Sequence, residues 1–390
     1  MIYRDFKGKK LSLLGFGTMR LPLNEDKSIN EKEFQEMFDL AIENGVNYFD
    51  TAWPYHGGMS EVSLGKVMKK HDRSKFYIAD KYPGHVIDKS YDPKDVFERQ
   101  LKKLGTDYID FYLLHNVYEK SINVYEDPKW GIIDYFVEQK KLGRIKHLGF
   151  STHGSLETMK SFLDKYHNDL EFCQIQFNYI DWTLQNAKEK YELISSYNIP
   201  IWVMEPVRGG KLANLNEKHH SMLQAFNEGS DVSFALRFVQ GFDNVKMILS
   251  GMSSLEQMKD NLDTFKEYKP LTDKQKNILF EIAEDIKQAI PCTGCGYCLN
   301  GCPKHLNIPR MISTLNDMNV TKAINSVMWI EALADDLKPS ACIKCGACMK
   351  ICPQNIEIPK ILEDLTEKIK SIPSWKEISK QRVEESKKYK

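Results

Sequence analysis

Eight of the nine cysteines lie in two short runs toward the C-terminal end of the sequence. The first run, CTGCGYCLNGCP, begins at residue 292, and the second, CIKCGACMKICP, begins at residue 342. Each has the spacing Cys-x2-Cys-x2-Cys-x3-Cys-Pro, in which three close thiolates bind one [4Fe–4S] cluster and the fourth cysteine binds the other cluster. This crossing rule assigns Cys292, Cys295, Cys298 and Cys352 to one cluster, and Cys342, Cys345, Cys348 and Cys302 to the other.

Two structural zinc sites are the alternative interpretation, because four thiolates also suit tetrahedral zinc. Zinc sites commonly use two separated cysteine pairs, whereas here three cysteines at intervals of three precede a Cys-Pro. The doubled run therefore favours iron–sulfur clusters. The residues between the runs, 303–341, have a helical pattern, so this part of the chain resembles the α-helical ferredoxin domains of multi-subunit reductases. Such domains pass single electrons between a partner and a second redox centre.

Upstream of the cysteines, short apolar β-prone runs alternate with longer amphipathic ones. Eight strands are predicted, at 11–17, 47–52, 75–82, 108–115, 145–152, 172–179, 199–206 and 245–251. Helical periodicity fills the gaps, as in 31–45, where Gly45 is expected to end the helix. Eight such units in about 250 residues predict a closed (β/α)8 barrel. A doubly wound Rossmann fold would need a third glycine where Arg20 stands.

Four residues at the ends of the predicted strands could carry out acid–base chemistry: Asp50, Tyr55, Lys81 and His115. Catalytic residues of such barrels lie at the C-terminal ends of the strands. Carbonyl reduction needs a hydride on carbon and a proton on oxygen, and a tyrosine can donate that proton if a nearby cation lowers its pKa. Lys81 would supply the cation, Asp50 would hold Lys81, and His115 would orient the carbonyl oxygen.

Each of these four residues also has a structural interpretation when taken alone. Asp50 could be a turn residue, Tyr55 a packed aromatic, Lys81 a surface charge and His115 a core imidazole. Their joint occurrence at successive strand ends favours the catalytic interpretation.

The same residues carry a resemblance to a known family. The segments FDTAWPYHGGMSE, DKY and LLHN resemble the aldo-keto reductase signature, and the resemblance covers roughly residues 1–270. GFSTH, QIQFN and GMSSLEQMKDN resemble that family's cofactor-binding segments. The resemblance implies a carbonyl or alcohol substrate and a nicotinamide nucleotide, NADH or NADPH.

The resemblance also implies which residues bind the nucleotide. Ser151 and Gln174 would hold the carboxamide, with Thr152 in place of the usual Asn and Met204 in place of a stacking aromatic. Arg208 and Gly209, followed by Gly210 and Lys211, would contact the pyrophosphate, unless they form a flexible basic loop. The family's cations for the adenosine 2′-phosphate are replaced by Ser253 and Ser254, whereas Gln257 and Asn261 are retained. Without those cations an NADPH phosphate loses charge-assisted contacts, so NADH is an open alternative.

The predicted organisation is a barrel at 1–270, a linker helix at 271–290, a ferredoxin-like domain with two [4Fe–4S] clusters at 291–375 and a basic tail at 376–390. A nicotinamide gives two electrons as hydride, whereas a cluster takes one, so a flavin or a substrate that tolerates one-electron steps would have to link the halves. The alternative function is an electron-transfer module that serves a ferredoxin or a partner subunit, with the barrel as a scaffold. A third is that the clusters only brace the barrel.

Overall composition excludes some partners. Lysine plus arginine and aspartate plus glutamate each number 54, which gives no electrostatic reason to expect nucleic acid or an anionic membrane as partner. The N-terminal residues have no apolar run long enough for a signal peptide, and no stretch approaches the roughly 18 apolar residues of a membrane span. Because cytosolic thiols stay reduced, closely spaced cysteines suggest a cytoplasmic metal protein.

Overall fold

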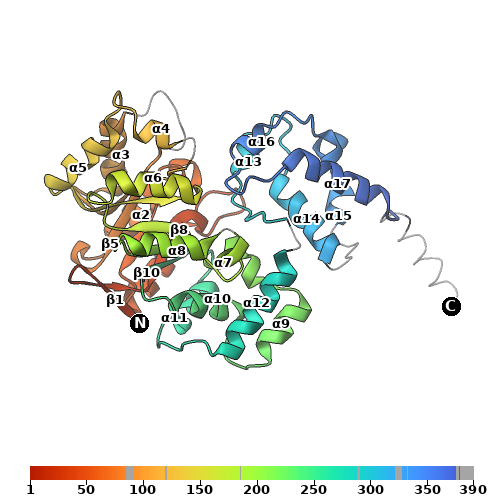
Figure 1. The fold of residues 1–390 in the computed structure, drawn as a ribbon, viewed down its shortest axis with the longest axis horizontal. Coiled ribbons are helices and arrows are strands. Elements are labelled where there is room, and N and C mark those ends of the chain that lie inside the picture. Colours follow the sequence, from red (N-terminus) through yellow and green to blue (C-terminus); the bar gives the residue numbers. More distant parts are fainter. Residues whose placement is uncertain are drawn as a thin grey trace. The chain divides into compact units, whose positions relative to one another are not determined.

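The computed structural model describes residues 1–84, 92–118, 121–184, 186–287, 290–320, 327–331, 333–374 and 377. The chain forms two compact units, Met1–Ala283 and Glu284–Lys390, which Figure 1 colours along the sequence. Among the described residues, no helix is both long and apolar enough to cross a membrane. The expected basic tail lies outside the described residues, except for residue 377.

The first unit is a closed barrel of eight parallel strands, which confirms the predicted fold class. In order around the barrel the strands are β10 (Val245–Ser250), β3 (Leu14–Gly17), β4 (Tyr48–Asp50), β5 (Tyr77–Tyr82), β6 (Ile109–Leu114), β7 (Ile145–Thr152), β8 (Cys173–Gln176) and β9 (Ile201–Met204). Each overlaps its predicted range. The closed order differs from the open sheet of a Rossmann fold.

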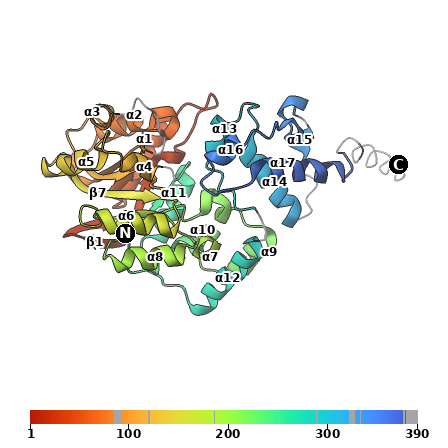
Figure 2. The same cartoon turned by 45° about the horizontal axis from the view of Figure 1, so that its top comes forward.

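Helices surround these strands (Figures 1 and 2). They are α1 (Glu31–Glu43), α2 (Ser60–Met68), α3 (Pro93–Leu104), α4 (Ile122–Tyr125), α5 (Ile132–Lys141), α6 (Leu156–Tyr166), α7 (Asp181–Leu184), α8 (Ala187–Ser196), α9 (Glu217–Gln224), α10 (Asp231–Gln240), α11 (Leu255–Thr264) and α12 (Asp273–Lys287). Helix α1 shows why they form. Asn30 caps its N-terminus by accepting a hydrogen bond from the Glu33 N–H. Its buried face consists of Phe34, Met37, Phe38 and Ala41. Gly45 follows it with φ +86°, as the sequence predicts.

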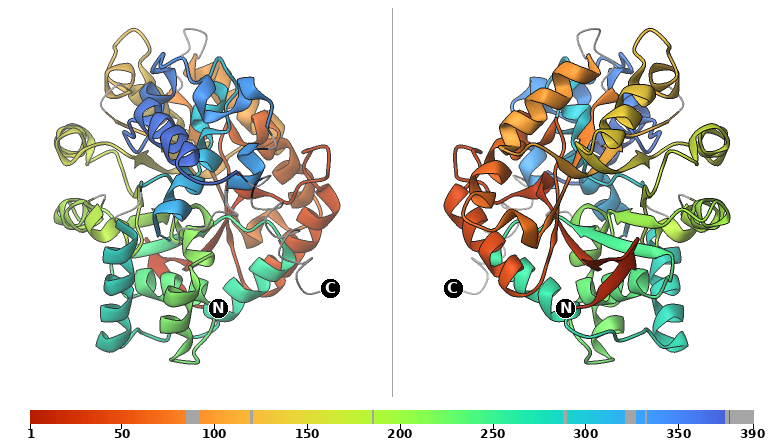
Figure 3. Two further views of the ribbon diagram at one scale, coloured as in Figure 1. Left: turned by 90° about the vertical axis from the view of Figure 1, so that its right-hand side faces the viewer. Right: turned by 90° about the vertical axis from the view of Figure 1, so that its left-hand side faces the viewer.

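An N-terminal hairpin closes one end of the barrel and was not expected from the sequence. Its strands are β1 (Tyr3–Phe6) and β2 (Lys9–Ser12), and the right-hand panel of Figure 3 looks toward it. The two turn residues, Lys7 and Gly8, both have positive φ, as a tight hairpin turn requires. Phe6 is buried in the barrel end, with its ring 5.1 Å from that of Trp202. The predicted first strand, 11–17, is therefore divided between the hairpin and the barrel.

A half-buried carboxylate near this end of the barrel provides a stability prediction. Glu171 lies 2.5 Å from His147 Nδ1 and 3.1 Å from Lys7 Nζ, and it also pairs with Lys140. Burial alone would raise its pKa, but these hydrogen bonds lower the pKa to about 2. Because this pKa lies below the ordinary value of 4.5, the stabilisation is complete above about pH 4.5 and is lost as the pH falls toward 2.

We therefore expect Glu171→Gln to lower the free energy of unfolding at pH 7 by on the order of 2–3 kcal/mol. The measurement is urea unfolding of both proteins at pH 7 and pH 3, followed by tryptophan fluorescence. The difference between them should shrink at pH 3, and a difference that stays constant with pH would contradict the assignment.

The second unit is helical in every described segment that has regular structure. It contains α13 (Tyr297–Asn300), α14 (Ile308–Val320), α15 (Met328–Glu331), α16 (Ala347–Lys350) and α17 (Ile358–Lys370). Helices α14 and α17 pack together over a core that includes Met311, Leu315 and Leu362. The helical prediction for 303–341 is confirmed where α14 and α15 lie, whereas 321–326 and 332 are outside the described residues.

Candidate active site and cluster-binding site

Three of the four predicted acid–base residues meet around one buried ammonium group. Lys81, near the end of β5, is fully buried, and its Nζ lies 2.6 Å from Asp50 Oδ1 at the end of β4. The same Nζ donates to the Thr51 carbonyl oxygen at 2.7 Å and lies 3.5 Å from the Tyr55 hydroxyl. A charge so deeply buried needs this pairing, which in turn fixes the position of the ammonium next to the phenol.

Tyr55 begins a short 3-10 segment, Tyr55–Gly58, in the loop that follows β4. The backbone of this segment is left-handed, because His56, Gly57 and Gly58 all have positive φ. The His56 Nε2 atom accepts from the Leu21 N–H at 3.2 Å, which ties this loop to the chain that leaves β3. The half-buried Tyr55 ring is thereby kept above Lys81, whose Nζ lies 4.9 Å from the ring centre.

His115 completes the group from the next strand. It follows β6 directly and is buried, and its ring meets that of Tyr55 edge-on at a centre-to-centre distance of 6.2 Å. Its backbone is fixed on both sides, since its N–H donates to the Tyr82 carbonyl oxygen and its own carbonyl oxygen accepts from the Tyr125 hydroxyl. The structure thus brings all four sequence-predicted residues to the C-terminal ends of three adjacent strands.

The electrostatics of the group differ from the sequence expectation in one respect. The sequence suggests that Lys81 lowers the pKa of Tyr55, but the pKa of Tyr55 is raised well above 10 by burial and by the negative charges of Asp50, Glu205 and Asp80. Burial also raises the pKa of Asp50 despite the attraction of Lys81. The Lys81 charge is paired with Asp50, so Tyr55 remains a neutral phenol. A protonated phenol is the form that a proton donor needs.

The residues expected to hold a nicotinamide lie on β7, β8 and β9. Ser151 and Gln174 are paired across neighbouring strands, and the Ser151 hydroxyl accepts from the Asn116 N–H. The Gln174 amide contacts Met204 Sδ at 3.6 Å, and among the described residues its Oε1 is buried without a hydrogen-bond partner. The Thr152 hydroxyl instead holds the following loop, by donating to the Val117 carbonyl oxygen. Gln174 and Met204 are therefore together, whereas Thr152 is already engaged.

Arg208 is buried rather than part of a flexible loop. It begins the 3-10 segment Arg208–Ala213, in which Gly209 also has positive φ. The Arg208 side chain pairs with buried Asp181 at 3.3 Å. Asp181 also accepts hydrogen bonds from Gln176 and Asn178 at 2.7 and 2.6 Å. The guanidinium therefore organises the loop after β9, and its charge is paired within the protein.

The residues after β10 form hydrogen bonds with one another. The Ser254 hydroxyl caps α11 by accepting from the Gln257 N–H, and the Gln257 side chain accepts from the Ser253 N–H at 2.8 Å. Asn261 turns back to donate to the Ser250 hydroxyl. Ser253, Ser254 and Gln257 are thus together at the start of α11, whereas Asn261 is buried and contacts the end of β10.

Two charged residues at this end of the barrel were missed by the sequence analysis. Arg20 leaves β3 with its side chain against Gly251, where an added Cβ would lie 3.4 Å from the Arg20 Cβ, and its carbonyl oxygen accepts from the Ser253 hydroxyl. Its buried Nη2 has no hydrogen-bond partner among the described residues. Glu205 follows β9 with φ +57°, and burial, opposed by Arg20, raises its pKa to about 7. Their positions just after apolar strands were the available signal.

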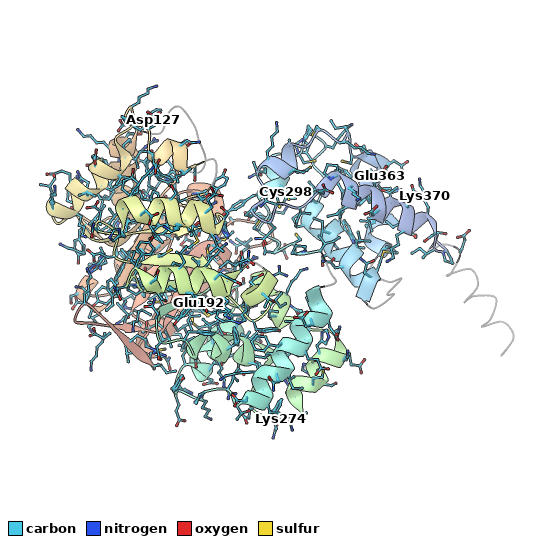
Figure 4. All side chains as sticks on the ribbon, viewed as in Figure 1. Asp127, Glu192, Lys274, Cys298, Glu363 and Lys370 are labelled. Carbon is cyan, nitrogen blue, oxygen red and sulfur yellow. The ribbon has the colours of Figure 1, made fainter. Side chains whose placement is uncertain are left out.

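The eight cysteines of the second unit line two small cavities. One cavity is lined by Cys292, Cys295, Cys298 and Cys352, and the other by Cys302, Cys342, Cys345 and Cys348. These are the two sets of four that the crossing rule gives. Figure 4 labels Cys298, which lies on α13. None of the nine cysteines forms a disulfide.

The donor set of each cavity is suited to an iron–sulfur cluster. Across the described residues, no three side chains of His, Cys, Asp and Glu lie close enough together to hold a single metal ion. Burial and the neighbouring thiols raise the pKa of Cys298 to about 12. Four thiolates facing one cavity repel one another unless positively charged iron lies between them, so the donor set fits an iron–sulfur cluster.

The backbone repeats as faithfully as the cysteines. Positive φ angles occur at Gly294 and Lys344, at Gly296 and Gly346, and at His305 and Asn355, each pair fifty residues apart. Helices α13 and α16, and then α14 and α17, begin with the same offset. The second unit is therefore two copies of one loop-and-helix element that face each other.

Comparison with known proteins agrees with this architecture. The aldo/keto reductase family matches residues 13–284, and the 4Fe-4S dicluster domain matches residues 291–357. The uncharacterized oxidoreductase YqkF of Bacillus subtilis is 26% identical over 310 residues, covering 72% of this chain and 95% of that protein. The NADH-specific methylglyoxal reductase of Escherichia coli is 22% identical over 288 residues, covering 63% of this chain and 85% of that protein.

Among solved structures, aldo-keto reductase AKR11C1 from Bacillus halodurans in its holo form is 25% identical, with a TM-score of 0.57. The match covers 72% of this chain and 96% of that one. The family match spans most of the chain and includes the whole barrel with its four acid–base residues. The chain therefore belongs to the aldo/keto reductase family, as an oxidoreductase that carries a C-terminal 4Fe–4S dicluster domain.

Proposed function

We propose that the barrel interconverts a carbonyl and an alcohol with a nicotinamide nucleotide, and that the C-terminal domain binds two [4Fe–4S] clusters that transfer electrons. The observation that carries the first part is the buried Lys81 ammonium, which lies 2.6 Å from Asp50 and 3.5 Å from the Tyr55 hydroxyl. Such a phenol beside a paired ammonium is suited to proton donation at a carbonyl oxygen.

In the reductive direction, a bound nicotinamide would supply a hydride to the carbonyl carbon. Tyr55 donates its hydroxyl proton to the oxygen that becomes the alcohol. Lys81 stabilises the phenolate that remains, while Asp50 keeps Lys81 in place. His115 orients the carbonyl oxygen by a hydrogen bond.

For the nucleotide we propose contacts from Ser151, Thr152, Gln174, Met204, Arg208 and Gly209, and from Ser253, Ser254, Gln257 and Asn261. Arg20 adds a cation next to Gly251 that can face a phosphate group. The serines at 253 and 254, together with the E. coli relative that is named as NADH-specific, support NADH as the first nucleotide to test.

For the clusters we propose the two sets of four cysteines that line the cavities as ligands. The domain would span 291–375, behind a barrel domain at 1–270 and a linker helix at 271–290. A flavin, or a substrate that tolerates one-electron steps, would connect hydride chemistry to single-electron transfer. Reduced thiols without disulfides fit the cytoplasm, where we place the protein.

A second candidate function is an electron-transfer module in which the barrel is a scaffold. It is favoured by the exposed Ser253 and by Arg208, whose charge is already paired with Asp181. In that case the clusters would exchange electrons with a redox partner, and no carbonyl would be reduced.

The test is to add NADH and then NADPH to anaerobically purified protein, after a check for bound flavin, while the visible absorbance of the clusters is followed. We expect bleaching, with NADH as effective as NADPH or more so, because the 2′-phosphate lacks its usual cations. Reduction by dithionite but by neither nucleotide would favour the second candidate.

A further inference from the structure

The two cysteine runs carry an unusually apolar surface. Four large hydrophobic side chains from these runs are exposed, although the runs make up a small part of the chain: Leu299 (40%), Ile343 (57%), Met349 (38%) and Ile351 (41%). We call these four the motif surface. Exposed apolar groups that gather in one place mark binding surfaces on soluble proteins.

These side chains come from segments that lie together within the second unit. Leu299 is on α13 and Met349 is on α16, and the two helices pack against each other. Ile351 lies over Gly301, where an added Cβ would come within 2.6 Å of its Cδ1 atom. This close approach brings the end of one run onto the other.

The motif surface also reaches the second cluster cavity. Ile343 lines that cavity together with Lys304, Cys302 and Cys345, and Cys345 is itself exposed. Both cavities have buried apolar walls, which include Leu306 in the second cavity and Ile312 in the first, but the first has no exposed residue in its lining. A cluster in the second cavity would thus have a rim made by the exposed surface, which is the position from which an electron can be exchanged.

Within the two cysteine-containing stretches themselves, the charges have one sign. The stretches 292–304 and 342–354 contain Lys304, Lys344 and Lys350 and no aspartate or glutamate, whereas the whole chain is balanced at 54 of each sign. Lys344 is partly compensated, because it pairs at 2.8 Å with Glu363 of α17, which Figure 4 labels. An apolar centre with a cationic rim complements a partner with an acidic rim.

We propose that the motif surface docks a small acidic electron-carrier protein of the ferredoxin class. The carrier gives one electron to the cluster held by Cys302, Cys342, Cys345 and Cys348, so that the carrier is oxidised, the cluster is reduced, and no bond or proton changes. This inference rests on the proposed cluster binding. Transient redox complexes use small interfaces, for which four apolar side chains and a few charges are sufficient.

The experiment uses the full chain with its clusters, mixed anaerobically with a reduced acidic bacterial ferredoxin in a stopped-flow instrument. The second-order rate constant of cluster reduction is measured at low and high salt. For the unchanged protein the rate should fall as salt rises, because opposite charges steer the encounter.

The double variant Ile343→Ser with Met349→Ser should lower the rate constant by about tenfold, and Lys304→Glu should both lower it and weaken its salt dependence. The matched controls are Leu142→Ser and Lys32→Glu, which change a 62% exposed leucine and an 89% exposed lysine of the barrel unit. The controls should stay within about twofold of the unchanged protein. Iron content and reduction by dithionite are measured for every protein. If the double serine variant loses its clusters, Lys304→Glu still tests the proposal.

Three results would overturn the proposal. The ferredoxin could fail to reduce clusters that dithionite reduces, or the variants could react as fast as the controls. Sedimentation could also show that the motif surface joins two copies of this chain and that the serine variant is monomeric. Absence of clusters from the unchanged protein is a separate outcome, because it would contradict the proposed function itself.

Discussion

Replacing Tyr55 by phenylalanine is expected to lower kcat for carbonyl reduction by about 10²–10⁴-fold. The change removes one hydroxyl and keeps the ring that packs against His115. Since only the proton donor is lost, KM for the carbonyl should change little compared with kcat. The measurement is steady-state reduction of a small aldehyde panel with NADH and NADPH, combined with reduction of the clusters by dithionite, which should be unaffected.

The matched control is Tyr77→Phe, because Tyr77 begins the same strand, β5, that carries Lys81 near its other end. That variant should keep its turnover. The raised pKa of Tyr55 adds a pH expectation: the donor stays protonated below pH 10, so reduction should not decline in this range through loss of the Tyr55 proton. Unchanged turnover in Tyr55→Phe would contradict the assignment of Tyr55 as the proton donor.

Replacing Cys352 by alanine is expected to remove one of two clusters and about half of the iron, because each cube needs four thiolates. The cavity lined by Cys352 also holds Cys292, Cys295 and Cys298, all from the other run. Cys173→Ala is the control, since this thiol is buried in the barrel and belongs to neither run. Iron and sulfide content and the electron paramagnetic resonance of the reduced protein give the cluster count.

Two double variants test the crossing directly. Cys295→Ala with Cys352→Ala damages one cavity twice, so one cluster should survive. Cys295→Ala with Cys302→Ala damages both cavities, so both clusters should be lost. If each run held its own four-cysteine cluster, the two results would be exchanged.

Much of the barrel could be predicted from the sequence because its strands are buried on both faces and read as apolar runs. The hairpin could not, since the apolar run at 11–17 continues through Leu13 and gives no sign of a break between two strands. Leu11 packs at the barrel end with Phe6, whereas Leu14 starts the barrel wall. That division depends on side chains from β6, β9 and β10, which are distant in the sequence.

The site shows the same limit. Asp50, Lys81 and His115 were identified because their strands fix where they point. Arg20 and Glu205 were missed because their importance comes from loop geometry: a positive φ at Glu205 and the absence of a side chain at Gly251. Similarly, the sequence predicts that Arg208 contacts a pyrophosphate, with a flexible basic loop as the alternative, and only the fold brings Asp181 to its side chain.

If the cysteines bind two clusters as proposed, the sharing of ligands between the two runs also sets the order in which the protein can mature during synthesis. Cys298 leaves the ribosome roughly 50 residues before Cys352, which takes several seconds at 5–20 residues per second. Cys292, Cys295 and Cys298 are therefore synthesised before Cys352, the fourth cysteine of their cavity. The cavity of the second run can be completed first, when Cys348 emerges, because Cys302 has already been made. A chain that ends before residue 352 would lack the cluster of its first run, however intact that run is.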